Sequence, residues 1–439
     1  MSRRVIEKLR QGGHRAYFVG GCVRDQLLER TVKDRDIATS AHPGEVAAIF
    51  PGARTQGSRF GVCVVRDGAE LVEVATFRSD GGYSDGRRPD KVTFASDARV
   101  DVSRRDFTIN GILYDPASGE YLDYVGGRAD LQARLVRAIG DPFQRFAEDR
   151  LRMLRAVRFA AALGFAIERG TMAAITAQSA EISTVAPERI REELGRILTE
   201  GRARRGFELL SATGLLGALL PEVAALRGVE QPPEFHPEGD VWTHTMLMLG
   251  GLRSPSEPLS WGVLLHDIGK PDTFRMADRI RFHGHVNRGV ELAQEICARL
   301  RFSNADTARV LALVGNHMKF MDLRRMRPGK VRRFVEQAHF DDHLELHRLD
   351  CLASHGKLDN YRFARDRLVE FSAEDPVRPL LRGDDLKAEG YRPGPVFGKI
   401  LALVEELHLD GKLGDRASAL KLVRERFPLS SANSPGARE

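Results

Sequence analysis

The stretch FVGGCVRDQLLERTVKDRDIAT, residues 18–39, decides the fold of the first domain. The apolar run 16–19 predicts a strand, Gly20 and Gly21 predict a tight turn, and the segment that follows predicts a helix. A glycine turn at the start of a helix lets the backbone approach a phosphate, to which Arg24 could add its positive charge. Taken alone, a Gly-Gly pair is more often simply a turn.

Asp34 and Asp36, near the end of this stretch, are the stronger signal. Two carboxylates at positions i and i+2 of a strand project from the same face, where their oxygens can hold hard cations such as Mg²⁺. A two-metal catalytic site needs such an arrangement. Glu73, in the strand-like segment ELVEVAT (70–76), is the third carboxylate that we expect if that strand lies next door. A lone Asp-x-Asp is often a solvated turn, but the preceding glycine turn favours a metal-dependent site.

Two later motifs carry further polar groups. Arg104, Arg105 and Asp106 precede an apolar run, in which Asn110 could bind a ribose hydroxyl. Further on, RFAEDRLRMLRAVRFAAALGF (145–165) predicts an amphipathic helix with an arginine stripe.

On that predicted helix, Asp149 and Arg152 are spaced i, i+3, so we expect them side by side on one face, with Arg155 and Arg158 continuing the stripe. A carboxylate beside a guanidinium can read the edge of a base by hydrogen bonds. The same spacing is also typical of a salt bridge on a solvated helix face.

Length and composition set the class of protein. The 439 residues carry a net charge of +6 with 42% hydrophobic and 29% charged residues, which is ordinary for a soluble globular protein of about two to four domains. No apolar run is long enough for a membrane span, and the basic start MSRRVIEKLRQGG lacks the apolar core of a secretory signal. Four scattered cysteines without a CxxC pair fit a reducing cytoplasm.

Near residue 142 the predicted secondary structure changes from a mixture of strands and helices to helices, and a Pro- and Gly-rich break lies at 227–239. We therefore expect a small mixed α/β head followed by a long helical remainder, within which a histidine-rich body begins near residue 227. The polar end SSANSPGARE (430–439) predicts disorder.

The body carries an ordered set of metal-ligand residues in the pattern H…HD…D, namely His244, His266, Asp267 and Asp350. Imidazoles with carboxylates suit a divalent transition metal, and an adjacent His-Asp pair can share one ion or bridge two. His283, His285 and His317 could complete a second metal site. Buried structural histidines would explain one or two of these residues, but hardly the ordered set.

The motifs at 18–39, 104–115 and 145–165, followed by PERIREELGRIL (187–198), resemble the class II tRNA nucleotidyltransferase and bacterial poly(A) polymerase family over residues 15–215. The resemblance implies an α+β protein with a small mixed β-sheet, polymerase-beta-like nucleotidyltransferase head (1–140) that needs Mg²⁺, followed by a helical neck (141–226), an HD-containing body (227–355) and a helical tail (356–439). It implies catalytic, metal-holding roles for Asp34 and Asp36, triphosphate binding by Gly20, Gly21 and Arg24, and phosphate and sugar binding by Arg105, Asp106 and Asn110. It also implies that Asp149 and Arg152 bind the incoming cytosine or adenine, supported by Arg155 and Arg158.

The histidine pattern resembles the HD phosphohydrolase domain attached to some bacterial tRNA nucleotidyltransferases, where it removes terminal phosphates or opens 2′,3′-cyclic phosphates. A metal-dependent hydrolase acting on RNA ends or nucleotides is therefore a second functional hypothesis of a different class.

The expected reaction adds the 3′-terminal CCA to tRNA from CTP and ATP. The loop 79–91 resembles the flexible loop of family members that add the terminal A, which argues against a CC-only enzyme but leaves an A-only enzyme open. A poly(A) polymerase ranks lower, because such enzymes usually lack the HD pattern. The basic run RRMRPGKVRR (324–333) could contact RNA phosphates, and we expect recognition of the acceptor arm by shape. No membrane partner is expected, and the oligomeric state stays open.

Overall fold

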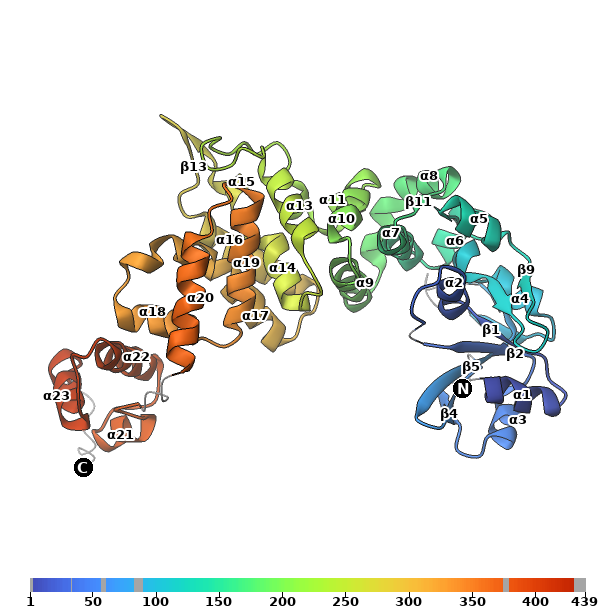
Figure 1. The fold of residues 1–439 in the computed structure, drawn as a ribbon, viewed down its shortest axis with the longest axis horizontal. Helices are drawn as coiled ribbons and strands as arrows, with labels where there is room; N and C mark the ends of the chain where they lie inside the picture. Colours follow the sequence, from blue (N-terminus) through green and yellow to red (C-terminus); the bar gives the residue numbers. More distant parts are fainter. Residues whose placement is uncertain (1–2, 33, 57–60, 83–89, 374–378, 430–439) are drawn as a thin grey trace, which may run out of the picture.

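The computed structural model describes residues 3–32, 34–56, 61–82, 90–373 and 379–429 and forms an elongated molecule (Figure 1). The sheet-containing head lies at one end, shown in blue, and the helical tail at the other, shown in red. The predicted disorder of 430–439 and most of the loop 79–91 lie outside the described residues.

The head is built on a seven-stranded sheet in the order β3-β4-β5-β2-β1-β8-β9. Strands β2 and β5 are parallel and all other neighbours are antiparallel. The strands are β1 (Ala16–Val19), β2 (Asp36–Thr39), β3 (Arg54–Gln56), β4 (Val62–Asp67), β5 (Glu70–Thr76), β8 (Ile112–Tyr114) and β9 (Tyr121–Asp123). The parallel register pairs Asp36 with Glu73, so the expectation that the second acidic strand lies next door is confirmed.

One face of the outer strands forms the head core and the other stays open. Cys63 and Val65 of β4, with Val72 and Val74 of β5, are buried, while the alternate residues point the other way. The remaining head elements are α1 (Arg3–Gln11), α2 (Gly21–Leu27), α3 (Pro43–Ile49), β6 (Arg78–Gly81), β7 (Lys91–Phe94), α4 (Ala98–Ser103), η2 (Thr108–Asn110), α5 (Gly127–Ala133) and β10 (Leu135–Val136).

A helical neck joins the head to the body, and its long helix α7 packs on α9 and α10. Its elements are α6 (Pro142–Glu148), α7 (Leu151–Leu163), β11 (Ala166–Ile167), α8 (Arg169–Gln178), η3 (Ser179–Thr184), α9 (Pro187–Thr199), α10 (Ala203–Ala212), α11 (Leu215–Leu219) and α12 (Pro221–Ala224). One hydrophobic core runs from the head through the neck into the body, so the head and neck are packed together rather than linked by a flexible hinge.

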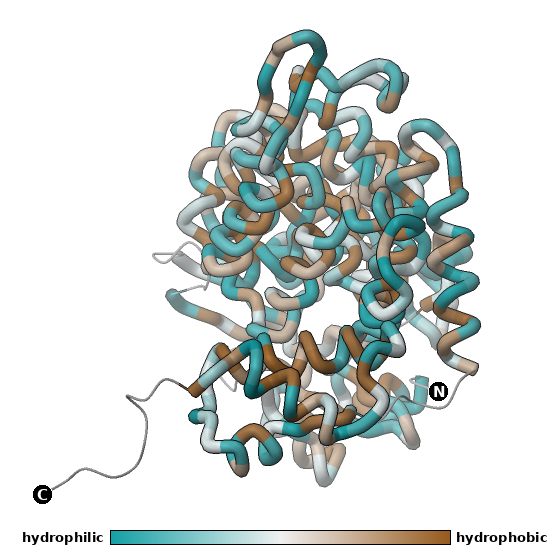
Figure 2. The backbone as a smooth tube through the Cα atoms, turned by 90° about the vertical axis from the view of Figure 1, so that its left-hand side faces the viewer, coloured by the Kyte–Doolittle hydropathy of each residue, from teal (hydrophilic) through white to brown (hydrophobic). Residues whose placement is uncertain are grey.

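In the described part of the body and tail, the regular structure is helical apart from one short hairpin, and Figure 2 shows hydrophobic and hydrophilic stretches alternating along the tube. The body elements are α13 (Val241–Gly251), α14 (Glu257–Leu265), α15 (Lys270–Thr273), β12 (Arg275–Met276), β13 (Ile280–Arg281), α16 (His285–Arg299), α17 (Asn304–Asn316), η4 (His317–Arg325), α18 (Pro328–Val335) and α19 (Phe340–Ala353). The tail helices are α20 (Asp359–Ser372), α21 (Gly383–Ala388), α22 (Pro395–Leu409) and α23 (Arg416–Arg426).

The predicted α+β fold is confirmed: a small mixed sheet is followed by a long helical remainder. Among the described helices, none combines the length and apolar character that a bilayer crossing requires.

Candidate active sites

The glycine turn places a backbone corner beside polar side chains at the head. Gly20 has a φ of +80°, a left-handed conformation that glycine adopts without strain. It is followed at once by α2, whose Arg24 is buried and donates from Nη1 to Asn110 Oδ1 at 2.9 Å. The turn, the arginine and the asparagine, far apart in sequence, therefore lie together as the motifs predict.

Three carboxylates meet where the start of β2 lies beside the middle of β5. Asp36 is the first residue of β2, and its register partner Glu73 lies on β5. Asp34 precedes β2 and is exposed, so only one of the two expected strand positions is within a strand. Burial and the neighbouring charge of Glu73, with a smaller contribution from Asp34, raise the pKa of Asp36 to about 6. This crowded negative charge fits a bound hard cation such as Mg²⁺.

A cleft of about 440 Å³ joins these groups to the neck. From the head it is lined by Gly20, Gly21, Arg24, Asp34, Asp36, Arg105 and Asn110, and from the neck by Arg155, Arg158, Phe159, Arg196 and Glu200. The structure thus brings most of the predicted nucleotide-contacting residues to one hollow between head and neck.

A continuous chain of hydrogen bonds crosses this head–neck junction. Asn110 Nδ2 donates to Asp106 Oδ1 at 3.0 Å, and the guanidinium of Arg155 donates to Asp106 Oδ2 at 2.6 Å. Although burial opposes ionisation, Arg155 lowers the pKa of Asp106 to about 2. Asp106 is therefore a firmly ionised anchor for the arginine.

Phe159 is a residue that sequence reasoning missed. Its ring lies below three guanidiniums of the cleft, those of Arg24, Arg155 and Arg158, at 5.1, 5.5 and 4.2 Å from the ring centroid. The available signal was an aromatic residue directly after the arginine stripe. The contacts make Phe159 a shared support for arginines from the head and from the neck.

Asp149 and Arg152 are not side by side on a helix face. The chain leaves helical geometry at Asp149, between α6 and α7, and Asp149 pairs with Arg189 of α9 at 3.1 Å. Arg152 instead pairs with Glu148 at 2.7 Å. The reason is local: the backbone of Asp149 is extended, and its Oδ1 accepts a hydrogen bond from the backbone N–H of Leu151 at the start of α7.

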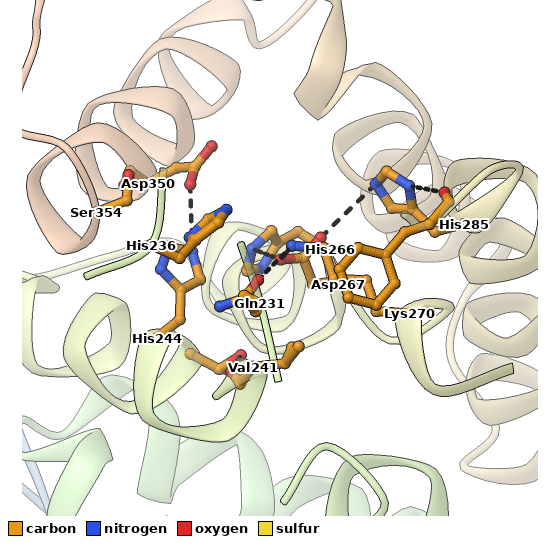
Figure 3. A network of polar contacts seen from close by, with 12 residues as sticks. Gln231, His236, Val241, His244, His266, Asp267, Lys270, His285, Asp350 and Ser354 are labelled. Atoms are coloured by element: carbon orange, nitrogen blue, oxygen red, sulfur yellow. Dashed lines mark hydrogen bonds and ion pairs between the residues drawn. The ribbon is translucent and has the colours of Figure 1, made fainter. Parts of the chain in front are cut away.

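The second candidate site lies in the body, where five helical segments bring imidazoles and carboxylates together (Figure 3). Among the described residues, three groups of three have ligand atoms within 4.8 Å of one another, and two of them consist of residues predicted from the sequence: His244, His266 and Asp350; and Asp267, His285 and His317. The third group is His236, Glu238 and His244. Figure 3 shows Asp350 of α19 and His285 of α16 approaching from opposite sides. The four residues of the H…HD…D pattern and two of the three additional histidines therefore converge.

Backbone contacts fix which nitrogen of each histidine faces the site. His266, His285 and His317 donate from Nδ1 to the carbonyls of residues 263, 282 and 314 at 2.9, 2.8 and 2.7 Å. Because a carbonyl only accepts, each Nδ1 is protonated, and in the neutral ring Nε2 then carries the lone pair. The buried Nε2 atoms of His244 and His266 lie 3.2 Å from Asp350 Oδ1 and 3.1 Å from Asp267 Oδ2. This is the arrangement of metal-binding histidines.

Further polar residues lie beside the predicted metal ligands. His283 lies on the wall of the adjoining pocket of about 620 Å³ rather than in any of the groups of three. Glu238, which the sequence analysis did not single out, accepts from Nδ1 of His244 at 2.6 Å and from Nδ1 of His236 at 2.9 Å. Lys270, from the HDIGK sequence, lies 2.6 Å from Asp267 and is buried.

The basic run 324–333 is partly neutralised by the tail. Arg333 pairs with Glu405 of α22 at 3.3 Å, and Lys330 lies 3.7 Å from Glu406. Arg332 pairs within its own helix with Glu336 at 3.0 Å. The run therefore contributes to the body–tail contact as well as to surface charge.

Comparison with known proteins confirms the resemblance. The chain matches the models of the poly A polymerase head domain (16–137), of the probable RNA and SrmB-binding site of polymerase A (164–226) and of the HD domain (240–345). It is 46% identical over 211 residues to a CCA-adding enzyme of Lactobacillus delbrueckii subsp. bulgaricus, over 48% of this chain and 53% of the relative. For a CCA-adding enzyme of Geobacillus stearothermophilus the identity is 45% over 220 residues, 50% of this chain and 54% of the relative. The chain thus spans about half the length of the curated relatives it matches.

Solved structures resemble nearly the whole chain. The CCA-adding enzyme of Bacillus stearothermophilus in complex with CTP has a TM-score of 0.70 and 27% identity, covering 96% of this chain and 97% of that one. The Thermotoga maritima CCA-adding enzyme complexed with tRNA has a TM-score of 0.55 at 20% identity, with 96% and 94% coverage, and shows a shared fold alone.

Proposed function

We propose that this chain, which combines a poly(A) polymerase-type head, the associated RNA-binding segment and an HD domain, is a tRNA nucleotidyltransferase that adds the 3′-terminal CCA from CTP and ATP. The observation that carries the proposal is the head–neck cleft, which is lined by a glycine turn, six arginines and the carboxylates Asp34 and Asp36. The names of the similar proteins, CCA-adding enzymes including one in complex with CTP, support the same choice of reaction.

In the proposed mechanism, the backbone N–H groups at Gly20 and Gly21 and the guanidinium of Arg24 bind the triphosphate at the start of α2. Arg105 adds a second cationic group, and Asn110 binds the sugar. Asp34 and Asp36, with Glu73 beside them, would hold Mg²⁺, which lowers the pKa of an attacking hydroxyl and offsets charge at the α-phosphate. These contacts place the α-phosphate next to the carboxylates, and pyrophosphate leaves toward the arginines.

Base selection is assigned to Asp149 and Arg152, with Arg155 and Arg158 in support. In the structure, the first two side chains bind Arg189 and Glu148. To read cytosine or adenine they must exchange these protein partners for the base. The proposal therefore includes a rearrangement at the junction of α6 and α7 when nucleotide binds.

The remaining parts receive supporting roles in the proposal. The head (1–140) is catalytic, the neck (141–226) recognises the base and contacts RNA, and body (227–355) and tail (356–439) hold the acceptor arm of tRNA. The name of the Thermotoga maritima complex with tRNA agrees with this partner. All four cysteines are free and buried, which supports a reducing compartment, the cytoplasm.

A second function is favoured by the body site: a metal-dependent phosphohydrolase acting on RNA ends or nucleotides. Two groups of three ligands, with Nε2 atoms held toward them, fit one or two divalent transition metal ions. Such ions would activate a water for attack on a phosphoester. Lys270 and the wall residue His283 offer donors to the phosphate oxygens.

The test of the first function uses tRNA transcripts that end at the discriminator base, at –C and at –CC, each incubated with Mg²⁺ and CTP, ATP or both. We expect stepwise addition of C, C and A that then stops, with products resolved to single nucleotides. Extension of the –CC transcript alone would identify an A-adding enzyme, and a ladder of A a poly(A) polymerase.

The site assignment is tested in the same assay by substitution. Asp36→Ala should reduce incorporation to background while the protein stays folded, because the carboxylate is at the sheet end and not in the core. Circular dichroism and thermal unfolding check the fold. Incorporation near the parental rate would rule out Asp36 as a catalytic residue.

A further inference from the structure

The loop that leads into α13 lies against the candidate metal ligands of the body and has no role in the functions proposed above. This loop, residues 227–240, has the sequence RGVEQPPEFHPEGD. Its Glu238 belongs, with His236 and His244, to the third group of three potential ligands. The side chain of Glu238 is only 7% exposed, so its charge is removed from water and needs partners in the protein.

The end of the loop is fixed by hydrogen bonds on both sides. Asp240 accepts from the backbone N–H groups of Gly228 at 2.7 Å and of Thr243 at 2.9 Å, so it closes the loop and caps α13. Gly239, directly after Glu238, has a φ of +118°, a conformation that residues with a side chain rarely adopt. The backbone that follows Glu238 is therefore held in one position.

One oxygen of Glu238 meets two imidazoles. Oε1 accepts from Nδ1 of His244 at 2.6 Å and from Nδ1 of His236 at 2.9 Å. Because an ionised carboxylate only accepts, both Nδ1 atoms carry a proton. Nε2 of His244 is then the nitrogen left for a metal, and it lies 3.2 Å from Asp350 Oδ1. Separations of 2.6 and 2.9 Å are those of hydrogen bonds to a charged acceptor.

The second imidazole on Glu238 faces the pocket. His236 lines the pocket of about 620 Å³ beside the metal ligands, whereas Glu238 lies behind it and does not. With Nδ1 on Glu238, Nε2 of His236 points away from that carboxylate. The rings of His236 and His244 are nearly perpendicular, with centroids 5.1 Å apart. Glu238 thus holds one imidazole at the metal ligands and one at the pocket wall.

The same loop also reaches the second group of ligands (Figure 3). Gln231 Nε2 donates to the carbonyl of Gly239 at 3.5 Å, and Gln231 Oε1 accepts from Lys270 Nζ at 2.6 Å. Lys270 Nζ in turn lies 2.6 Å from Asp267 Oδ2. One loop therefore contacts a ligand of each predicted group, His244 through Glu238 and Asp267 through Lys270.

We infer that Glu238 is the positioning residue of the body metal site, an inference that rests on the proposed phosphohydrolase function. It fixes the tautomer and the orientation of His244, so that Nε2 faces the metal, and its negative charge makes that nitrogen a stronger ligand. Glu238 acts through His244 and is not itself a ligand, because its Oε1 is already occupied by two N–H donors.

The test measures metal affinity without any substrate. Full-length protein freed of metal with a chelator is titrated with Co²⁺, whose visible absorption reports imidazole ligands, while excess Mg²⁺ occupies the head carboxylates. Glu238→Ala should weaken Co²⁺ binding by about 10- to 100-fold. Glu238→Gln, which keeps an oxygen that can accept from His244, should weaken it by only about three- to tenfold. Circular dichroism checks the fold, and wild-type affinity in the folded variants would overturn the inference.

Two controls separate positioning from ligation. Glu234→Ala removes an exposed carboxylate from the same loop and should bind Co²⁺ as the wild type does. His236→Ala removes the other imidazole on Glu238 but leaves its contact with His244, so both the affinity and the amount of bound Co²⁺ should stay unchanged. If this variant bound one Co²⁺ fewer per chain, the third group would itself hold a metal, and the inference would be wrong.

Hydrolysis is measured separately, with 2′,3′-cyclic nucleotides and nucleoside monophosphates. If Glu238→Ala weakened Co²⁺ binding but the wild type hydrolysed none of them, the phosphohydrolase proposal would fail and the positioning role would stand. If the wild type hydrolysed them and Glu238→Ala kept the wild-type Co²⁺ affinity, the positioning role alone would fail. A wild type that bound no Co²⁺ at the body would overturn the inference as well.

Discussion

At the scale of single residues, Phe159 shows how one apolar ring can organise a charged cleft. Phe159→Leu keeps an apolar side chain but removes three cation–π contacts, each worth about 0.5–2 kcal/mol. We expect kcat/KM for CTP and ATP to fall about tenfold, with the larger part in KM, because Arg24 and Arg155 lose a shared support. Phe159→Tyr, which retains the ring, should restore most of the activity.

The Phe159 variants also distinguish a role in positioning the cleft arginines from a role in stabilising the fold. Thermal unfolding of Phe159→Leu should shift little in comparison with the kinetic effect, since Phe159 packs beside Phe107 at the edge of the cleft and leucine fills much of that space. If Phe159→Leu and Phe159→Tyr were equally active, the ring would have no part in positioning the arginines.

At the scale of one helix, α19 carries buried histidines that make stability depend on pH. His343 is buried among Phe334 and Phe340, and burial, with Lys319 and His339 nearby and Asp342 opposing, lowers its pKa to about 4. The unfolded chain binds a proton near pH 6.5 and the folded chain does not. Above pH 6.5, His343 is neutral in both states and does not lower the free energy of unfolding. As the pH falls from 6.5 toward 4, the unfolded chain gains the proton first, so the free energy of unfolding falls by about 3 kcal/mol at most.

The direction of this pH dependence can be measured directly. The free energy of unfolding, from urea titration at pH 7 and pH 5, should fall less for His343→Phe than for the wild type. His347 on the same helix, whose pKa burial also lowers to about 4, leaves a residual dependence. His14→Gln in the head is the control and should keep the wild-type difference. An unchanged difference in His343→Phe would show that His343 already carries a proton in the folded protein.

Elements also show where sequence reasoning succeeds and where it stops. The glycine turn, the acidic strand end and the histidine pattern could be predicted because each depends on residues close in sequence or on a fixed order of ligands. The pairing of Asp36 with Glu73 needed one assumption, that two strands are neighbours, and the register confirms it. Asp149 could not be placed, because its partner Arg189 lies 40 residues away and its side chain caps α7.

The basic run 324–333 illustrates the same limit over a longer distance. Its charges suggested an exposed surface for RNA, but two of them pair with Glu405 and Glu406 of α22, more than 70 residues later. A local charge pattern cannot reveal partners that tertiary packing supplies. In the proposed function, these two ion pairs reduce the net positive charge that the run offers to RNA phosphates, which changes the magnitude of the expected salt dependence but not its direction.

At the scale of the whole molecule, the two candidate sites lie in different domains, so substitutions that inactivate one site should leave the other functional. His266→Ala with His317→Ala removes one ligand from each of the two groups of three that contain the predicted residues, and neither residue lines the head–neck cleft. We expect the wild type to copurify with a divalent metal and the double variant to lose that metal, measured by elemental analysis after dialysis, while it retains CCA addition. Asp36→Ala should show the opposite result: no nucleotide incorporation, with unchanged metal content of the body. If the body variant also stopped incorporation while staying folded, the two sites would have to be coupled through the neck, whose continuous core reaches both.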